Sequence, residues 1–237
     1  MDNESLKNQP EQNPWMDLVF NIALPSLIMM KASGEDRLGP VWGLVVALAF
    51  PLCYGLYDFN KQKKVNGFSI LGLVSVLLTG GISLLKLDSH WIAVKEAAIP
   101  GIIGLIVLIS LKTKTPLIRK ILLNDRVVDM RLIESALATR NNQAAFEKCV
   151  VKTSWFLALS FFVSSLLNYI LAKVLIVSAP GTTAYTEELG KMTAMSYPVI
   201  MLPSLLMLGF SLWFLFSGLR KLTGLESVML LRNNGVS

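Results

Sequence analysis

A lysine and a glutamate stand side by side in a stretch of the chain that is otherwise apolar. Lys95 and Glu96 lie in "SHWIAVKEAAIPG", residues 89–101, directly before the run "IIGLIVLISL". Ionisable side chains inside a membrane helix are costly and tend to mark substrate or ion paths. Adjacent residues on a helix point about 100° apart, so these two charges are poorly placed to neutralise each other. We therefore expect at least one of them to find a partner on another helix.

Two further features of this stretch affect the interpretation. Trp91 is typical of the outer membrane interface, which places Lys95 one turn, about 6 Å, further in. A lysine stem can reach back from that depth and keep its ammonium in water, which is the simpler alternative. Pro100 cannot donate a hydrogen bond to the carbonyl of Glu96 and predicts a kink there. The freed carbonyl could then serve a ligand, a water or a side chain.

Other polar residues are expected at membrane depth, on the first and fifth of six candidate spans. The candidate intramembrane polar site comprises Lys95, Glu96, Asn168, Lys173, Asp17 and Asn21. Two interpretations remain open. The group could line a polar path, or ion pairs of Glu96 with Lys173 and of Lys95 with Asp17 could hold the helices together. Helix breaks are expected at Pro25, Gly80, Gly81, Pro100 and Pro203. The match between "LPSLIMM" (24–30) and "LPSLLML" (202–208) is interpreted as chance.

Catalytic signatures are absent from the sequence. His90 is the only histidine, and no HExxH, GxSxG, GxxxxGK or CxxC motif occurs. Cys53 and Cys149 are too far apart in sequence to suggest a disulfide framework or a metal site. We therefore expect no enzymatic activity and no cofactor or metal.

Composition explains which elements must position these residues. Hydrophobic residues make up 53% of the 237-residue chain and charged residues only 16%, against about a quarter in soluble domains. A membrane crossing needs about 20 mostly apolar residues. The sequence predicts an all-α, polytopic transmembrane bundle with about six spans. These spans are residues 15–30 (the weakest, since it is short), 38–57, 68–87, 91–111, 154–178 and 194–219.

The basic residues indicate the orientation of these spans. With both termini inside, sixteen of the 22 Lys and Arg residues fall in inner segments and four in outer loops. This pattern predicts a multi-pass protein of a bacterial inner membrane with cytoplasmic termini, and it argues against nucleic-acid binding. The expected organisation is a disordered tail (1–14), spans 1–4 (15–111), a basic cytoplasmic loop (112–152), spans 5–6 (153–220) and a cytoplasmic tail (221–237).

The loop over residues 112–152 is the only long one. Leu117, Ile118, Ile121 and Leu122 share a helical face opposite basic residues, which is typical of a short helix lying on anionic lipid. A second helix over about 129–140 would bring Ile133, Ala136 and Leu137 together. The loop is either a solvated connector or a docking surface for a cytoplasmic partner.

Several short motifs, taken together, resemble the bacterial intracellular septation protein A family of small inner-membrane proteins. They are Leu24-Pro25, Thr79-Gly80-Gly81, Trp91 with Lys95, "KTPLIRKIL" at 114–122 and "LLNYILAKVL" at 166–175, which contains Asn168. The chain looks closer still to a longer relative labelled as a predicted transporter or membrane protein. The insert at about 124–150 and the loop "SAPGTTAYTEELGKM" depart from the septation proteins. The resemblance implies a role in envelope maintenance and a partner at the division site, and no enzymatic reaction.

Two functions follow as hypotheses. The first is a non-enzymatic protein of the bacterial cell envelope that acts through the lipid bilayer, through envelope or division proteins, or as a homo-oligomer. The alternative is a small transporter or channel with a polar path around Lys95, Glu96, Asn168 and Lys173. Six spans are few for a single-chain transporter but workable as a dimer.

Overall fold

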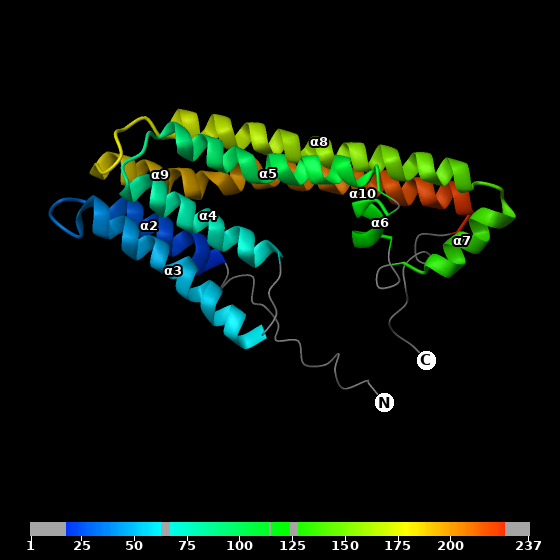
Figure 1. Cartoon of the computed structure of the whole chain (residues 1–237), viewed down its shortest axis with the longest axis horizontal. Coiled ribbons are helices and arrows are strands. Elements are labelled where there is room, and N and C mark those ends of the chain that lie inside the picture. Colours follow the sequence, from blue (N-terminus) through cyan, green and yellow to red (C-terminus); the bar gives the residue numbers. More distant parts are fainter. Residues whose placement is uncertain (1–17, 63–66, 114, 124–127, 226–237) are drawn as a thin grey trace. The chain divides into compact units, whose positions relative to one another are not determined.

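The computed structural model describes residues 18–62, 67–113, 115–123 and 128–225, and its regular elements are helices (Figure 1). In chain order they are η1 (Val19–Ala23), α2 (Leu24–Lys31), α3 (Gly39–Gln62), α4 (Gly67–Leu84), α5 (His90–Ser110), α6 (Leu117–Ile121), α7 (Met130–Thr139), α8 (Gln143–Leu175), α9 (Thr183–Ser196), η2 (Tyr197–Met201) and α10 (Leu202–Thr223). The elements labelled η are short π-helices.

Four helical stretches are long and apolar enough to cross a membrane. They are Gly39–Tyr57, His90–Ser110, Gln143–Leu175 and the continuous helix Thr183–Thr223. Two shorter apolar helices are Val19–Lys31 and Gly72–Leu84. The chain is therefore an integral membrane protein, and the predicted all-α membrane bundle is confirmed. A count of six crossings stays a prediction, because two of the six helices are short.

The chain divides into two compact units, each built from segments that are far apart in the sequence. Unit 1 comprises Met1–Lys95 and Tyr169–Tyr197, and unit 2 comprises Glu96–Asn168 and Pro198–Ser237. The division falls inside α5, inside α8 and within η2. The tails at 1–14 and 226–237, and Asp17, lie outside the described residues.

In unit 1, helix α2 packs against both α3 and α9, and α3 also packs against α4. The approach of α2 and α9 depends on Gly190. A Cβ atom at this position would lie 2.9 Å from the Cβ of Met29 and 2.9 Å from the carbonyl oxygen of Ser26. Small residues allow this kind of close backbone contact, which is how membrane helices gain packing energy without a hydrophobic driving force.

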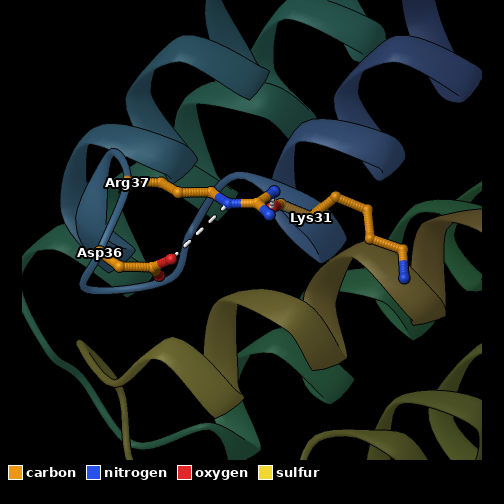
Figure 2. A network of polar contacts seen from close by, with 3 residues as sticks. All are labelled: Lys31, Asp36 and Arg37. Atoms are coloured by element: carbon orange, nitrogen blue, oxygen red, sulfur yellow. Dashed lines mark hydrogen bonds and ion pairs between the residues drawn. The ribbon is translucent and has the colours of Figure 1, made fainter.

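The turn between α2 and α3 is held by Arg37, as Figure 2 shows. The guanidinium of Arg37 donates a hydrogen bond to the backbone carbonyl of Lys31, in the last turn of α2. Its Nε lies 3.9 Å from a carboxylate oxygen of Asp36. Basic side chains commonly satisfy the carbonyls left unpaired at a helix C-terminus. Both residues of the ion pair are exposed, so this contact shapes the loop and adds little stability.

Unit 2 contains a folded cap at the end where α8 begins and α10 finishes (Figure 1). We call the described residues in 111–113, 115–123 and 128–142, which include α6 and α7, the cap. Its apolar side chains share one buried cluster with the membrane helices. This cluster includes Ile118, Leu123, Val128, Ile133 and Leu137 of the cap, Phe146, Cys149 and Val150 of α8, and Leu215 and Leu219 of α10. The cap thus shares its apolar core with α8 and α10.

The position of Trp155 explains why a cap is needed. From Trp155, which is exposed as expected at an interface, to Leu175 is about 30 Å of helix, enough to cross the hydrocarbon. The whole of α8 has 33 residues, or about 50 Å. We therefore expect its first turns to project beyond the bilayer, where lipid would not cover Phe146 and Val150. α6 and α7 cover them instead.

Two expectations about the cap need correction. The short helix α6 does not present its whole apolar face to lipid, because Ile118 is only 1% exposed and belongs to the buried cluster, although Ile121 of the same face is 53% exposed. Arg119 forms an ion pair with Glu147, and its guanidinium carbon lies 5.3 Å from the ring centroid of Phe146. The second helix forms close to the predicted bounds, as α7. Residues 143–152, expected as loop, already belong to α8.

The loop expected at "SAPGTTAYTEELGKM" is also mostly helical. Thr182 accepts a hydrogen bond from the backbone N–H of Tyr185 and so starts α9, which runs without interruption into η2 and α10. Glu188 on α9 then reaches back to the end of α8, where it accepts hydrogen bonds from the backbone N–H groups of Val177 and Ser178, at 3.0 and 2.9 Å. This loop is therefore an ordered connection.

The expected helix breaks behave in two ways. Pro25 and Pro203 each follow a five-residue π-helix, η1 or η2, so the helix widens just before the proline and continues after it. α4 continues through Gly80 and Gly81, and α5 continues through Pro100. Neither glycine nor Pro100 ends a helix. Gly80 has a packing reason, since a Cβ there would lie 3.1 Å from Leu48 of α3.

Candidate functional site

Lys95 lies in the second turn of α5 and is buried within unit 1, with an exposed fraction of only 7%. Its ammonium donates hydrogen bonds to the hydroxyl of Thr79 at 2.8 Å and to that of Ser75 at 3.1 Å. Both acceptors belong to α4, one turn apart. The ammonium therefore points into the protein, and the alternative of a lysine that reaches out to water is wrong.

Thr79 is oriented for this contact by its own helix. Its hydroxyl donates to the backbone carbonyl of Ser75 at 3.0 Å, which leaves the oxygen lone pairs free to accept from Lys95. A buried charge is tolerated only where hydrogen bonds replace its lost hydration. The two hydroxyls replace part of the hydration of the ammonium.

The same face of α4 continues to a second buried hydroxyl contact. Ser83 follows Thr79 by one turn, and its hydroxyl lies 2.9 Å from the phenolic oxygen of Tyr185 on α9. Both side chains are buried, at 3% and 1% exposure. Ser75, Thr79 and Ser83 thus form a hydroxyl stripe, spaced four residues apart over about 12 Å of an otherwise apolar helix. Lys95 and Tyr185 bind this stripe from two other helices.

Two of the remaining predicted site residues, Lys173 and Asn21, also belong to unit 1. Lys173 is exposed and lies two residues before the end of α8. Asn21 is half-buried in η1. Asp17 is not among the described residues, so its predicted pairing with Lys95 stays untested.

Glu96 and Asn168 belong to unit 2. Glu96 is half-buried. The side-chain amide of Asn168 donates to the carbonyl of Ser164 at 2.8 Å, one turn earlier in α8. Asn168 thus satisfies part of its hydrogen bonding within its own helix.

A backbone carbonyl near Pro100 accepts a hydrogen bond from another helix. The hydroxyl of Ser165 on α8 donates to the carbonyl of Ala97 on α5 at 2.7 Å, within unit 2. A Cβ at Gly101 would lie 3.2 Å from the same hydroxyl, so the helices meet closely here. The use of the carbonyl of Glu96, which Pro100 leaves without its helical donor, stays a prediction.

Sequence reasoning placed Lys95 in a polar site but missed Ser75, Thr79, Ser83 and Tyr185 as parts of it. The signal was present as three hydroxyl residues at positions i, i+4 and i+8 of one apolar run, "SVLLTGGIS". That spacing predicts a polar stripe on one side of a helix. Tyr185 had no such signal, because nothing in a single sequence indicates which helix faces the stripe.

A metal site is not formed in the part of the chain that the structure describes. There, no three His, Cys, Asp or Glu side chains come together as a metal site. Two grooves of about 200 and 310 Å³ are lined mainly by apolar side chains, around Phe156 and Phe210 in unit 2 and around Phe20 and Tyr54 in unit 1. The hydroxyl stripe with Lys95 is therefore the candidate site, and the composition of the chain gives no indication of it.

No family model, no curated protein and no solved structure matches the chain. The resemblance to the septation protein A family stays a prediction. Two of its motifs do meet in space, since Thr79 of the Thr-Gly-Gly motif binds Lys95 of the Trp91–Lys95 motif.

Proposed function

We propose that this chain is a non-enzymatic protein of the bacterial inner membrane whose cap binds a protein of the cell envelope on the cytoplasmic side. The observation that supports the proposal is that α7 has one buried face and one exposed face. Ile133 and Leu137 are buried in the cluster, whereas Arg131, Glu134, Ser135 and Ala138 form an exposed face at positions i, i+3, i+4 and i+7. A partner would meet this face.

The ends of α7 are fixed, so the exposed face is preorganised. The carboxylate of Asp129 accepts a hydrogen bond from the backbone N–H of Leu132 at 3.0 Å and caps the start of α7. After the end of α7, the amide of Asn142 donates to the carbonyl of Leu222 at 2.8 Å, which ties the cap to α10. A rigid surface loses little entropy on binding, which favours a specific partner.

Site-specific photocrosslinking in cells tests this proposal. A photoreactive residue at Glu134 or Ala138, on the exposed face of α7, is expected to give a discrete adduct with another protein. The matched control is Leu159, 51% exposed on the membrane-spanning part of α8, where lipid adducts are expected. The absence of protein adducts from both α7 positions, or the same adducts from Leu159, would refute the proposal.

The hydroxyl stripe favours a second candidate, a small transporter with a polar path along α4. Lys95 supplies a charge and Ser75, Thr79 and Ser83 supply neutral donors and acceptors along one helix face. If the path carries solute, Lys95→Met abolishes uptake while the protein still accumulates and remains monodisperse. If Lys95→Met leaves the solute content of proteoliposomes unchanged across a panel of small anions and cations, this candidate fails.

A further inference from the structure

The outer surface of unit 2 carries basic side chains at one level of the bundle. Lys148 and Lys152 on α8 are exposed, and together with Trp155 they occupy positions i, i+4 and i+7 of one helix face. Trp155 is 57% exposed. On α10, Trp213 is 63% exposed, and Arg220 follows it by two turns on the same side, with Lys221 next to it. Both helices thus show a tryptophan and then basic residues further from the bilayer.

Side-chain contacts put the two helices in register. The ring of Phe156 lies 5.1 Å from that of Phe214 and 5.4 Å from that of Phe210, between ring centroids. Trp155 and Trp213 are the chain neighbours of Phe156 and Phe214, so the two tryptophans lie at about the same depth. Because tryptophan side chains prefer the membrane–water interface, this depth marks the boundary of the hydrocarbon.

The basic residues are in register as well. A Cβ at Gly218 would lie 2.5 Å from the Sγ of Cys149, so these two positions face each other. Lys148 precedes Cys149, and Arg220 and Lys221 closely follow Gly218. Lys148 and Arg220 therefore lie at one level, each seven residues or about 10 Å outside its tryptophan, and Lys152 lies about 5 Å outside Trp155.

These depths match the zone of lipid headgroups. The polar region of a bilayer extends about 5–7 Å beyond the hydrocarbon on each side. Lys152 falls inside this zone, and the flexible stems of Lys148, Arg220 and Lys221 can reach back into it. The nearby carboxylate of Glu147 is engaged by Arg119, so it does not neutralise the lysines beside it.

We propose that Lys148, Lys152, Arg220 and Lys221 form a basic belt that binds the phosphate groups of anionic phospholipids at the base of the cap. The ligand class is a phospholipid with net negative charge, held by its headgroup at the belt and by its acyl chains against the apolar faces of α8 and α10. Each bound lipid would anchor the end of α8 or α10, against which the cap packs, to the surface of the bilayer.

Native mass spectrometry of the full chain, released from mixed phosphatidylglycerol and phosphatidylcholine micelles, tests this proposal. The belt variant carries Lys148→Gln, Lys152→Gln, Arg220→Gln and Lys221→Gln. A matched control removes the same charge elsewhere, with Lys31→Gln, Lys86→Gln, Lys173→Gln and Lys191→Gln, all exposed positions of unit 1. Circular dichroism and the elution volume check that both variants are folded.

The wild type is expected to retain phosphatidylglycerol in preference to phosphatidylcholine. Since each basic residue near an anionic surface contributes about fivefold, the belt variant is expected to lose at least about tenfold of this preference, and the control less than about twofold. Lys148→Arg with Lys152→Arg keeps the charge and keeps the preference. If the variant with all four substitutions does not fold, the double variant Lys148→Gln with Lys152→Gln is still expected to lose about fivefold or more of the preference for phosphatidylglycerol.

Three results would overturn the proposal. The belt variant could keep the full preference, or the control could lose as much as the belt variant, which would indicate a general effect of net charge. Millimolar inorganic phosphate could displace the lipid completely, which would indicate a site for free phosphate rather than for a phospholipid.

Discussion

The contact between Lys95 and Thr79 allows a quantitative test of the buried site. Lys95 is only 7% exposed, and the hydrogen bond from its ammonium to Thr79 is 2.8 Å long. A hydrogen bond to a charged group contributes about 1.5–3 kcal/mol, and burial at this level leaves little water to compensate for its loss. We expect the coupling energy between Lys95 and Thr79 to fall in this range.

A double-mutant cycle isolates this term. Lys95→Met keeps most of the side-chain volume and removes the charge, and Thr79→Val keeps the branched shape and removes the hydroxyl. Each single variant also disturbs other contacts, but those effects cancel in the cycle when they do not depend on the partner. The assay is unfolding of the purified protein in detergent by titration with dodecyl sulfate, followed by circular dichroism.

Ser83 provides a matched control on the same face of α4. Its hydroxyl pairs with Tyr185, and the two contacts of Lys95 on α4 are with Ser75 and Thr79. Lys95→Met combined with Ser83→Ala is therefore expected to be additive within about 0.5 kcal/mol. The reasoning is refuted if the Lys95–Thr79 pair is additive too, or if the Ser83 pair couples as strongly.

Three further substitutions test the packing that supports the site and the cap. Ile133→Ala removes a side chain with 0% exposure from the cap cluster, and we expect a loss of about 2–5 kcal/mol and faster proteolysis between α6 and α7. Ser165→Ala removes the donor to the carbonyl of Ala97 beside Pro100, with an expected loss of about 1 kcal/mol in the same unfolding assay. Gly190→Ala would drive a methyl group against the backbone of α2 and is expected to lower the thermal midpoint, whereas Gly72→Ala meets no atom within 4 Å and leaves it unchanged or higher.

The apolar elements could be predicted from the sequence because hydrocarbon imposes a length. A span over 91–111 was expected, and α5 runs from His90 to Ser110; a span from residue 38 was expected, and α3 begins at Gly39. The helix is the only open-ended backbone arrangement that satisfies its own hydrogen bonds in lipid. A run of about 20 apolar residues therefore specifies the element, although α3 continues to Gln62 and α4 ends at Leu84, where the expected spans end at residues 57 and 87.

The same reasoning fails where a helix leaves the membrane. Residues 143–153 of α8 and most of α9 contain too many polar residues to resemble a span, although they are helical. The cap is the clearest case, because Ile118 could face lipid or protein equally well on its hydropathy. Only the projecting ends of α8 and α10, with apolar side chains to be covered, decide that it faces protein.

The hydrogen-bond acceptors of Lys95 could not be predicted from a single sequence either. The charge and its depth were readable from Trp91 and the helical rise, but the direction of the side chain depends on which helix lies beside α5. Ser75 and Thr79 supply hydroxyl acceptors there, so the ammonium turns inward. In membrane proteins of this kind, hydroxyl residues spaced four apart on one apolar run should therefore be considered as hydrogen-bond acceptors for a lysine on another apolar run.

The paired "Leu-Pro-Ser-Leu" segments show that local sequence can fix local structure even where no repeat exists. Each segment follows a five-residue π-helix, although one begins α2 and the other begins α10. In the first, the N–H of Leu24 donates to the carbonyl of Val19, five residues earlier. The proline ring would otherwise collide with the carbonyl one turn before it, and the wider turn relieves that collision. With respect to a repeat, the match is interpreted as chance. At both places, however, a π-helix directly before the Leu-Pro pair relieves the collision of the proline ring with the backbone.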